Sequence, residues 1–225
     1  KISKSFGFTF VISSVIFDMD GVISDTQTWY SELDSKVLAR YGVTIAPEEI
    51  TRSYSGVSYN RMLSELFNRF GVGADKEAVI EVLHNELDSG LVNSKIAAVE
   101  GARDLVESLY NSKMKLAIAS GSRLGFIDYV LGELSLRDKF LEIVSSYELN
   151  EGKPDPGVFL LAASRLGENP QDCVVIEDGV SGMIGAKAAG MKCIGLVKEK
   201  DKSFYPADWL VTSLREVTVD GIKKL

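Results

Sequence analysis

Val15-Ile16-Phe17-Asp18-Met19-Asp20-Gly21 joins an apolar run to two carboxylates placed two residues apart and then to a glycine. The run is typical of a buried β-strand, in which residues i and i+2 point the same way. Asp18 and Asp20 would then converge at a strand's carboxyl end, where open α/β sheets bind ligands. Two close carboxylates repel each other, and a hard cation, above all Mg²⁺, relieves this repulsion. A strand followed by a polar turn is the alternative interpretation, so the rest of the chain decides between the two.

From residue 98 onward, strand-like and helix-like stretches alternate, which predicts parallel βαβ units with right-handed crossovers. The expected strands after the first one lie at 114–119, 142–145, 173–176, 192–196 and 209–211. The expected helices lie at 102–110, 123–131, 156–166 and 180–189, with a last helix after Thr212. We therefore predict an α/β fold whose core is a Rossmann-like parallel sheet flanked by helices.

Residues 27–92 break this alternation, because they carry helical patterns only, at 30–41, 46–54, 60–70 and 76–92. Helices inserted after the first strand would lie above the strand ends. We predict two domains: an α/β core of residues 1–26 and 93–225, and an all-helical cap of residues 27–92. His84, the single histidine of the chain, falls in an apolar helical pattern and is predicted to be a surface or packing residue.

The composition is that of an ordinary globular protein, with 225 residues, 45% hydrophobic and 25% charged. A net charge of −7 makes nucleic acid and anionic membranes poor partners, so an anionic substrate would need a local cationic site. No apolar run is long enough to span a membrane, and the apolar stretch from Phe6 to Ile12 is predicted to be a leader or an extra strand. Cys173 and Cys193 lie in apolar runs, which indicates reduced, buried thiols. We expect a cytoplasmic monomer.

Polar residues of complementary kinds follow four of the expected strands. They are the pair Asp18 and Asp20, then Ser120-Gly121-Ser122, then Lys153-Pro154, and finally Glu177-Asp178. Each has an ordinary explanation by itself: a serine that caps a helix, a solvated lysine, acids favoured at a helix N-terminus. Together, at one edge of a sheet, they favour phosphoryl transfer. A carboxylate can attack phosphorus, a metal and a lysine can offset the charge, and a second acid can protonate the leaving group.

These motifs resemble those of the haloacid dehalogenase superfamily, in the branch of β-phosphoglucomutase, phosphoglycolate phosphatase and small sugar-phosphate phosphatases. The resemblance extends over about residues 13 to 215 and is carried by four stretches, namely Asp18–Thr26, Ala119–Ser122, Lys153–Pro156 and Ile176–Gly182. It implies an inserted helical cap, with a hinge at Asp25 and Thr26, whose closure excludes water.

The resemblance also implies roles for individual residues. Asp18 would be the nucleophile and a Mg²⁺ ligand, and Asp20 the general acid/base, with its backbone carbonyl on the metal. The other implied ligands are Asp178 and, either as a ligand or as a supporting acid nearby, Glu177. The implied phosphate-binding residues are Ser120, Gly121 and Lys153, whereas Ser122 and Arg123 could hold a second phosphate.

Two activities of this branch remain open. An aspartate at position 20 is absent from the dehalogenases and phosphonatases, so its presence favours hydrolysis or transfer of a phosphate ester. The mutases usually have a lysine before the glycine of the cap loop, an arginine after its serine and a histidine after Asp-Thr. This chain has Ser55, Tyr59 and Tyr30 there. Arg52 and Arg61 flank the loop and either replace the missing charge or form a solvated helix face.

We therefore expect a Mg²⁺-dependent phosphatase that hydrolyses a small phosphorylated metabolite, a sugar phosphate or similar, through an aspartyl phosphate. A β-phosphoglucomutase-type phosphosugar mutase is the alternative. A catalytically idle binding domain is disfavoured because every charged member of the motif set is present. A nucleotide-binding Rossmann domain is disfavoured because no G-x-G-x-x-G follows the first strand.

Overall fold

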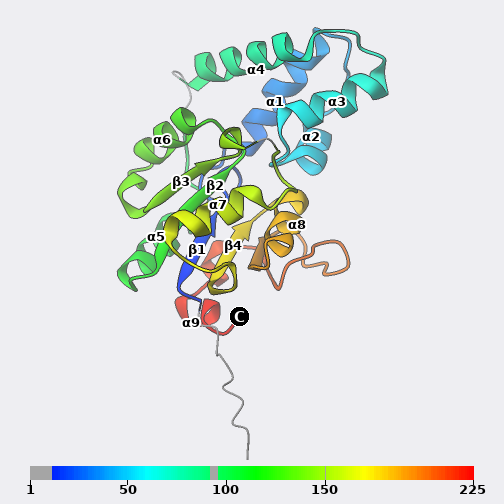
Figure 1. Ribbon diagram of the computed structural model, residues 1–225. Coiled ribbons are helices and arrows are strands. Elements are labelled where there is room, and N and C mark those ends of the chain that lie inside the picture. Colours follow the sequence, from blue (N-terminus) through cyan, green and yellow to red (C-terminus); the bar gives the residue numbers. More distant parts are fainter. Residues whose placement is uncertain (1–11, 92–95, 150) are drawn as a thin grey trace, which may run out of the picture.

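A six-stranded parallel sheet forms the centre of the molecule (Figure 1). The computed structural model describes residues 12–91, 96–149 and 151–225, so the leader or strand expected at Phe6–Ile12 lies outside it except for Ile12. The strands are β1 (Ser14–Phe17), β2 (Lys115–Ser120), β3 (Glu142–Ser145), β4 (Cys173–Glu177), β5 (Lys192–Leu196) and β6 (Trp209–Val211). Their order, β3-β2-β1-β4-β5-β6, is that of doubly wound dinucleotide-binding folds. The predicted Rossmann-like fold class is confirmed.

Helices cover both faces of this sheet (Figure 1). The core helices are α5 (Ala102–Asn111), α6 (Leu124–Glu133), α7 (Gly157–Leu166), α8 (Val180–Ala188) and α9 (Val219–Ile222). Short 3₁₀ turns are η1 (Arg137–Lys139), η2 (Ser146–Glu148), η3 (Pro170–Asp172) and η4 (Leu214–Glu216). Helices α5 and α6 pack on one face, whereas α7 and α8 pack on the other. The strands and helices expected from the alternating pattern all lie within a few residues of their predicted positions.

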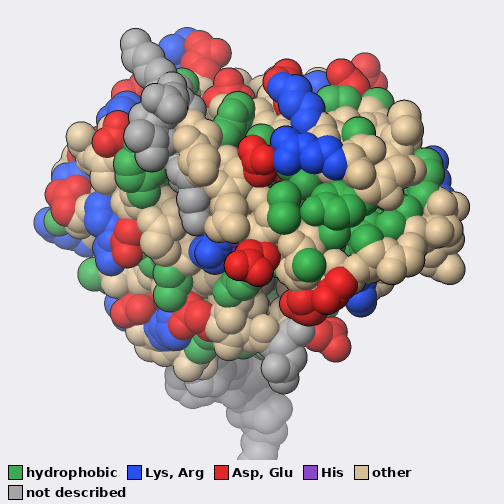
Figure 2. Space-filling view, turned by 90° about the horizontal axis from the view of Figure 1, so that it is seen from above, with side chains coloured by type: hydrophobic (Ala, Val, Ile, Leu, Met, Phe, Trp, Pro, Cys, Tyr) green, Lys and Arg blue, Asp and Glu red, His purple; other side chains and the backbone are tan. Residues whose placement is uncertain are grey.

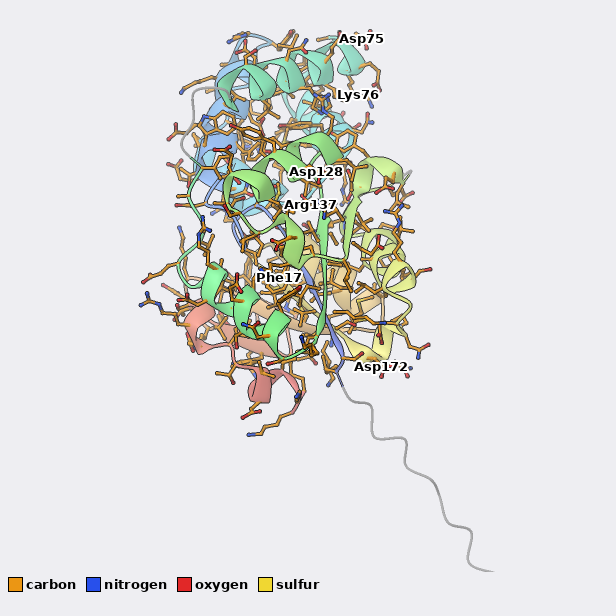
Figure 3. All side chains as sticks on the ribbon, turned by 90° about the vertical axis from the view of Figure 1, so that its left-hand side faces the viewer. Phe17, Asp75, Lys76, Asp128, Arg137 and Asp172 are labelled. Carbon is orange, nitrogen blue, oxygen red and sulfur yellow. The ribbon has the colours of Figure 1, made fainter. Side chains whose placement is uncertain are left out.

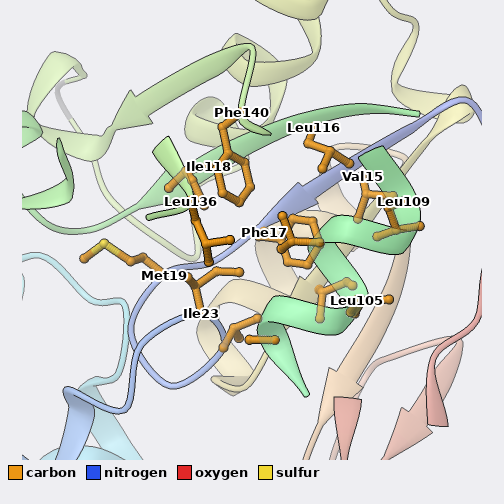
Figure 4. Packing of buried hydrophobic residues seen from close by; sticks show 14 of the residues in the cluster. Val15, Phe17, Met19, Ile23, Leu105, Leu109, Leu116, Ile118, Leu136 and Phe140 are labelled. Atoms are coloured by element: carbon orange, nitrogen blue, oxygen red, sulfur yellow. The ribbon is translucent and has the colours of Figure 1, made fainter. Parts of the chain in front are cut away.

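Strand β1 is buried on both faces, which fixes the position of the residues that follow it. Val15 and Phe17 point into the cluster shared with α5 and α6, whereas Ile16 points into the cluster shared with α7 and α8. The ring of Phe17 meets the edge of Phe140 with the centroids 5.8 Å apart, and Figure 4 shows this packing. Burial of each such side chain contributes about 1.5–3 kcal/mol. The strand therefore delivers Asp18 to the sheet edge on a rigid support.

Four further helices lie beyond the carboxyl ends of the strands (Figure 1). We call them the cap helices: α1 (Gln27–Ala39), α2 (Pro47–Tyr54), α3 (Tyr59–Phe70) and α4 (Lys76–Leu91). They share a buried apolar cluster of their own, which includes Val37, Leu63 and Leu83. Figure 3 labels Asp75 and Lys76 at the outer end of this group and Asp172 at the opposite end of the molecule. The domain boundaries themselves, 1–26 with 93–225 and 27–92, stay a prediction.

The structure also bears on the two cysteines and on the length of the helices. Cys173 and Cys193 are both free and buried, as predicted, and burial raises the pKa of the Cys173 thiol to about 12. Among the described helices, none has the length and apolar character needed to cross a membrane.

Candidate active site

Lys153 joins three of the four sequence motifs at the carboxyl edge of the sheet. Its ammonium group donates to Asp18 Oδ1 and, at 2.8 Å, to Glu177 Oε2. The side chain of Lys153 is fully buried, and those of Asp18 and Glu177 are nearly so. The remaining motif joins through Ser122, whose hydroxyl donates to Asp20 Oδ2 at 2.9 Å. The structure thus brings together residues from all four strand ends.

Negative charge exceeds positive charge in this cluster. Burial, followed by the neighbouring carboxylate of Glu177, raises the pKa values of Asp18 and Asp178 well above their usual range. Burial also raises the pKa of Asp20, against hydrogen bonds from Thr26 and Ser122 that favour its ionised form. Burial lowers the pKa of Lys153, but Asp18 and Glu177 more than offset this and raise it above its ordinary value. A further cation would stabilise the ionised carboxylates.

The residues present fit a magnesium ion. One carboxylate oxygen from each of Asp18, Glu177 and Asp178 lies within 4.8 Å of the others, and hard oxygen ligands are those that Mg²⁺ prefers. Gly21 has a positive φ of 86°, and a Cβ there would lie 2.2 Å from Asp178 Oδ2. A side chain at position 21 would therefore displace one of the candidate ligands.

The carboxylate of Glu177 already accepts several hydrogen bonds within the protein. Its Oε1 accepts from the backbone N–H groups of Asp178 at 3.1 Å and Gly179 at 2.9 Å, and its Oε2 accepts from Lys153. This arrangement favours the supporting role for Glu177, in which it orients Lys153 and the β4–α8 turn, over direct ligation of a metal.

The turn after β2 contributes the phosphate-binding candidates. Ser120 is fully buried, and its Oγ accepts from the backbone N–H of Ser122 at 3.0 Å, which shapes the turn. Gly121, Ser122 and Arg123 line the pocket beside Asp18, whereas Ser120 and Lys153 are not among its lining residues. Lys153 contacts Asp18, which lines the pocket.

A pocket of about 100 Å³ lies between this edge of the sheet and the cap helices. The core lines it with Asp18, Asp20, Gly121, Ser122, Arg123, Phe126 and Tyr147. The segments from Gln27 to Leu87 line it with Gln27, Tyr30, Asp34, Tyr54, Gly56, Val57, Tyr59, His84 and Leu87. Seen from the cap end, basic and acidic side chains lie interspersed on the described surface (Figure 2).

Hydrogen bonds join the segment of the cap helices to the core at two places. The hydroxyl of Ser181 donates to the carbonyl oxygen of Ser55 at 2.7 Å. His84 Nε2 lies 2.6 Å from the hydroxyl of Tyr147. His84 packs against tyrosine rings, as a packing residue would, but it also lines the pocket, which its sequence pattern did not predict.

Arg52 and Arg61 lie exposed on helices, which agrees with the second of the two alternatives left open for them, whereas Asp34 was not predicted as a pocket residue. Arg52 and Arg61 border a separate pocket, and Arg61 pairs with Glu65 at 3.0 Å, so neither replaces the mutase cations in the pocket beside Asp18. Asp34 was missed. The available signal was its position one helical turn after Tyr30, which puts both side chains on one face of α1.

Comparisons with known proteins agree with this geometry. The sequence profile described as haloacid dehalogenase-like hydrolase matches residues 15–196. Hexitol phosphatase B of Escherichia coli (strain K12) is 31% identical over 215 residues, covering 94% of this chain and 96% of that protein. β-Phosphoglucomutase of Bacillus subtilis (strain 168) is 31% identical over 218 residues, covering 93% of each. The crystal structure of β-phosphoglucomutase from Clostridium difficile superposes with a TM-score of 0.82 at 25% identity, covering 95% of this chain and 96% of that one.

Proposed function

The chain belongs to the haloacid dehalogenase-like hydrolase family, and from this premise we propose that it is a Mg²⁺-dependent phosphatase. Its substrate is a small phosphorylated metabolite, a sugar phosphate or similar, and the reaction proceeds through an aspartyl phosphate on Asp18. The relatives with phosphatase and phosphomutase names support a phosphoryl-transfer enzyme. One observation carries the proposal: Asp18, which contacts the buried Lys153, lines the same pocket as Asp20.

In the first step, a carboxylate oxygen of Asp18 attacks phosphorus and the bond from phosphorus to the leaving oxygen breaks. Asp20 donates its proton to that oxygen. In the second step, Asp20 takes a proton from water, the water oxygen attacks phosphorus, and Asp18 leaves as a carboxylate with release of phosphate. When bound by Asp18, Asp178 and the backbone at position 20, Mg²⁺ would offset the charge of the carboxylate and phosphate.

The hydrogen bonds of Asp20 suit this double role. Thr26 Oγ1 donates to its Oδ1 at 2.5 Å, and Ser122 Oγ donates to its Oδ2 at 2.9 Å. These bonds fix the carboxyl group toward the pocket, while burial raises its pKa and so increases the protonated fraction that an acid catalyst needs. Lys153 remains charged and can offset negative charge as the phosphoryl group transfers.

A β-phosphoglucomutase-type mutase is the second candidate, and Arg123 is the observation in its favour. Arg123 lines the pocket and could hold the second phosphate of a sugar bisphosphate. Against it, Tyr30 and Tyr59 line the pocket where the mutases usually carry a histidine and an arginine. We therefore infer a monophosphate substrate.

The test is phosphate release from a panel of small phosphate esters, with Mg²⁺ and with EDTA. The panel includes β-glucose 1-phosphate, with formation of glucose 6-phosphate followed in parallel. Metal-dependent phosphate release from sugar monophosphates supports the phosphatase. Isomerisation without net phosphate release would establish the mutase, and turnover of bisphosphates alone would contradict the inferred monophosphate specificity.

A further inference from the structure

Asp34 is a buried carboxyl group in the cap helices that the proposed chemistry does not use. It is 5% exposed, and it lines the same pocket as Asp18. The hydroxyl of Tyr59 donates to its Oδ1 at 2.9 Å. Among the described residues, no donor reaches its Oδ2. This oxygen belongs to a residue of the pocket wall and is able to accept a hydrogen bond from a ligand hydroxyl in the pocket.

The surroundings of Asp34 fit a polyhydroxylated ligand. Tyr30 and Tyr59 from the cap helices and Tyr147 from the core line the pocket around it. A tyrosine offers an apolar ring face and a hydroxyl group at its edge. Flat apolar faces suit the C–H groups of a sugar or polyol, whereas a carboxyl group suits its hydroxyls. Burial raises the pKa of Asp34 to about 7, so near neutral pH it can either accept from or donate to a hydroxyl.

A purely structural role explains Asp34 less well. The cluster of buried side chains that the cap helices share is apolar, whereas Asp34 lines the pocket. The Tyr59 hydroxyl is a neutral donor, so the Asp34–Tyr59 bond compensates only part of the cost of burying the carboxyl group. Two polar groups held together at a pocket wall, with one oxygen free to accept, are typical of a site that orients a ligand.

Resting on the proposed phosphatase function, we propose that Asp34 and Tyr59 bind a hydroxyl of the leaving group. They are specificity-determining residues, and they make the enzyme select phosphate monoesters of sugars or polyols over esters whose carbon chain lacks hydroxyls. Asp18 attacks phosphorus at one end of the pocket while Asp34 holds the substrate at the cap side.

The experiment compares two esters with the same three-carbon skeleton, glycerol 3-phosphate and n-propyl phosphate, and repeats the comparison with glucitol 6-phosphate and n-hexyl phosphate. The ratio of kcat/KM between the hydroxylated and the hydroxyl-free ester is measured with Mg²⁺. For Asp34→Ala we expect this ratio to fall about tenfold to a hundredfold, mainly through KM, because a hydrogen bond to a charged group is lost. Tyr59→Phe should lower the ratio by a smaller factor.

Glu32→Gln is the matched control, because Glu32 lies exposed on the same helix and the change likewise removes one carboxylate. Its ratio should equal that of the wild type. If Asp34→Ala does not fold, Tyr59→Phe and Asp34→Asn carry the test, since both keep the shape of the side chain. A ratio near one in the wild type, or a ratio unchanged in all the pocket variants, overturns the inference alone. Absence of phosphate release from every ester overturns the proposed function, and the inference with it.

Discussion

Asp18 and Asp34 are both buried carboxyl groups that line one pocket, yet the core and the cap helices surround them differently. Asp18 contacts a buried lysine and lies beside further carboxylates. Asp34 contacts one neutral hydroxyl, that of Tyr59. Crowded charge suits the transfer of a phosphoryl group, whereas a neutral environment suits the recognition of hydroxyls. The difference agrees with our proposal that the sheet edge supplies the chemistry and the helices above it supply the selection of the substrate.

The two regions also differ in how closely the backbone approaches their carboxyl groups. At the sheet edge, a Cβ on Gly182 would lie 1.9 Å from Glu177 Oε2, and one on Gly21 would lie 2.2 Å from Asp178 Oδ2. The core site therefore leaves no room for an added methyl group. Asp34 instead lies within the regular helix α1.

Asp18→Asn tests the core side of the comparison with the largest expected effect. The amide cannot form an acyl phosphate as the carboxylate does, so phosphate release should fall by at least about 10⁴-fold. Folding should remain intact, because asparagine has the same shape and Lys153 keeps Glu177 as a partner. Phosphate release is the measurement, with circular dichroism as the control for folding. Substantial residual turnover would refute the assignment of Asp18 as nucleophile.

Asp20→Asn should slow turnover by about 10²- to 10⁴-fold, because proton transfer to the leaving group and from water is lost. The expected loss depends on the leaving group. Esters with a strongly acidic leaving group, such as p-nitrophenyl phosphate, need less protonation and should lose less in the first step. Steady-state hydrolysis at the wild-type rate for an alkyl ester would exclude the acid/base role.

Gly182→Ala tests the close packing around the core site through stability. Its Cβ would overlap Glu177 Oε2, so we expect the free energy of unfolding to fall by about 1–3 kcal/mol. Gly132→Ala is the matched control, since Gly132 is also helical and has nothing within 4 Å of an added Cβ. That variant should gain up to about 1 kcal/mol from helix propensity. Denaturant unfolding measures both, and equal effects would contradict the packing argument.

The core site could be predicted from the sequence because its residues follow strands, directly for Asp18 and Asp178 and after a short loop for Lys153. A parallel sheet places all carboxyl ends at one edge, so the order of Asp18, Lys153 and Glu177 along the chain determines that they meet. The strands themselves were visible as apolar runs, and the structure confirms the predicted fold class. The roles assigned to these residues stay a prediction.

The wall formed by the cap helices could not be predicted in the same way. Asp34 lies on α1 and Tyr59 on α3, and their separation along the chain carries no sign of the hydrogen bond between them. His84 joins Tyr147 of the core only through the placement of α4 over the sheet edge. Helical periodicity predicts which face of a helix is apolar, but not which polar residue of one helix will meet which residue of another.

Asp34→Asn tests the cap side of the comparison with a smaller effect that depends on pH. Burial raises the pKa of Asp34 from 3.8 to about 7. Between about pH 4 and pH 7 the unfolded chain therefore binds fewer protons at this group than the folded protein does, and its contribution to stability falls as pH rises. Asparagine stays neutral at every pH, so the variant does not lose stability in this way as pH rises. The gain in the free energy of unfolding from Asp34→Asn should be larger at pH 8.5 than at pH 5.5, by on the order of 1–2 kcal/mol.

The other titratable groups around Asp34 do not produce this difference. Burial raises the pKa values of Tyr30 and Tyr59 well above their usual range and that of Tyr147 to about 12, so all three stay neutral at both pH values. His84 and Arg123 line the same pocket, and both are present in the variant and in the wild type, which are compared at each pH. Denaturant unfolding at the two pH values is the measurement, with Glu32→Gln as the exposed control. An equal effect of Asp34→Asn at both values would mean that burial beside a single neutral donor does not raise the pKa of Asp34, and the description of the cap side of the pocket would fail.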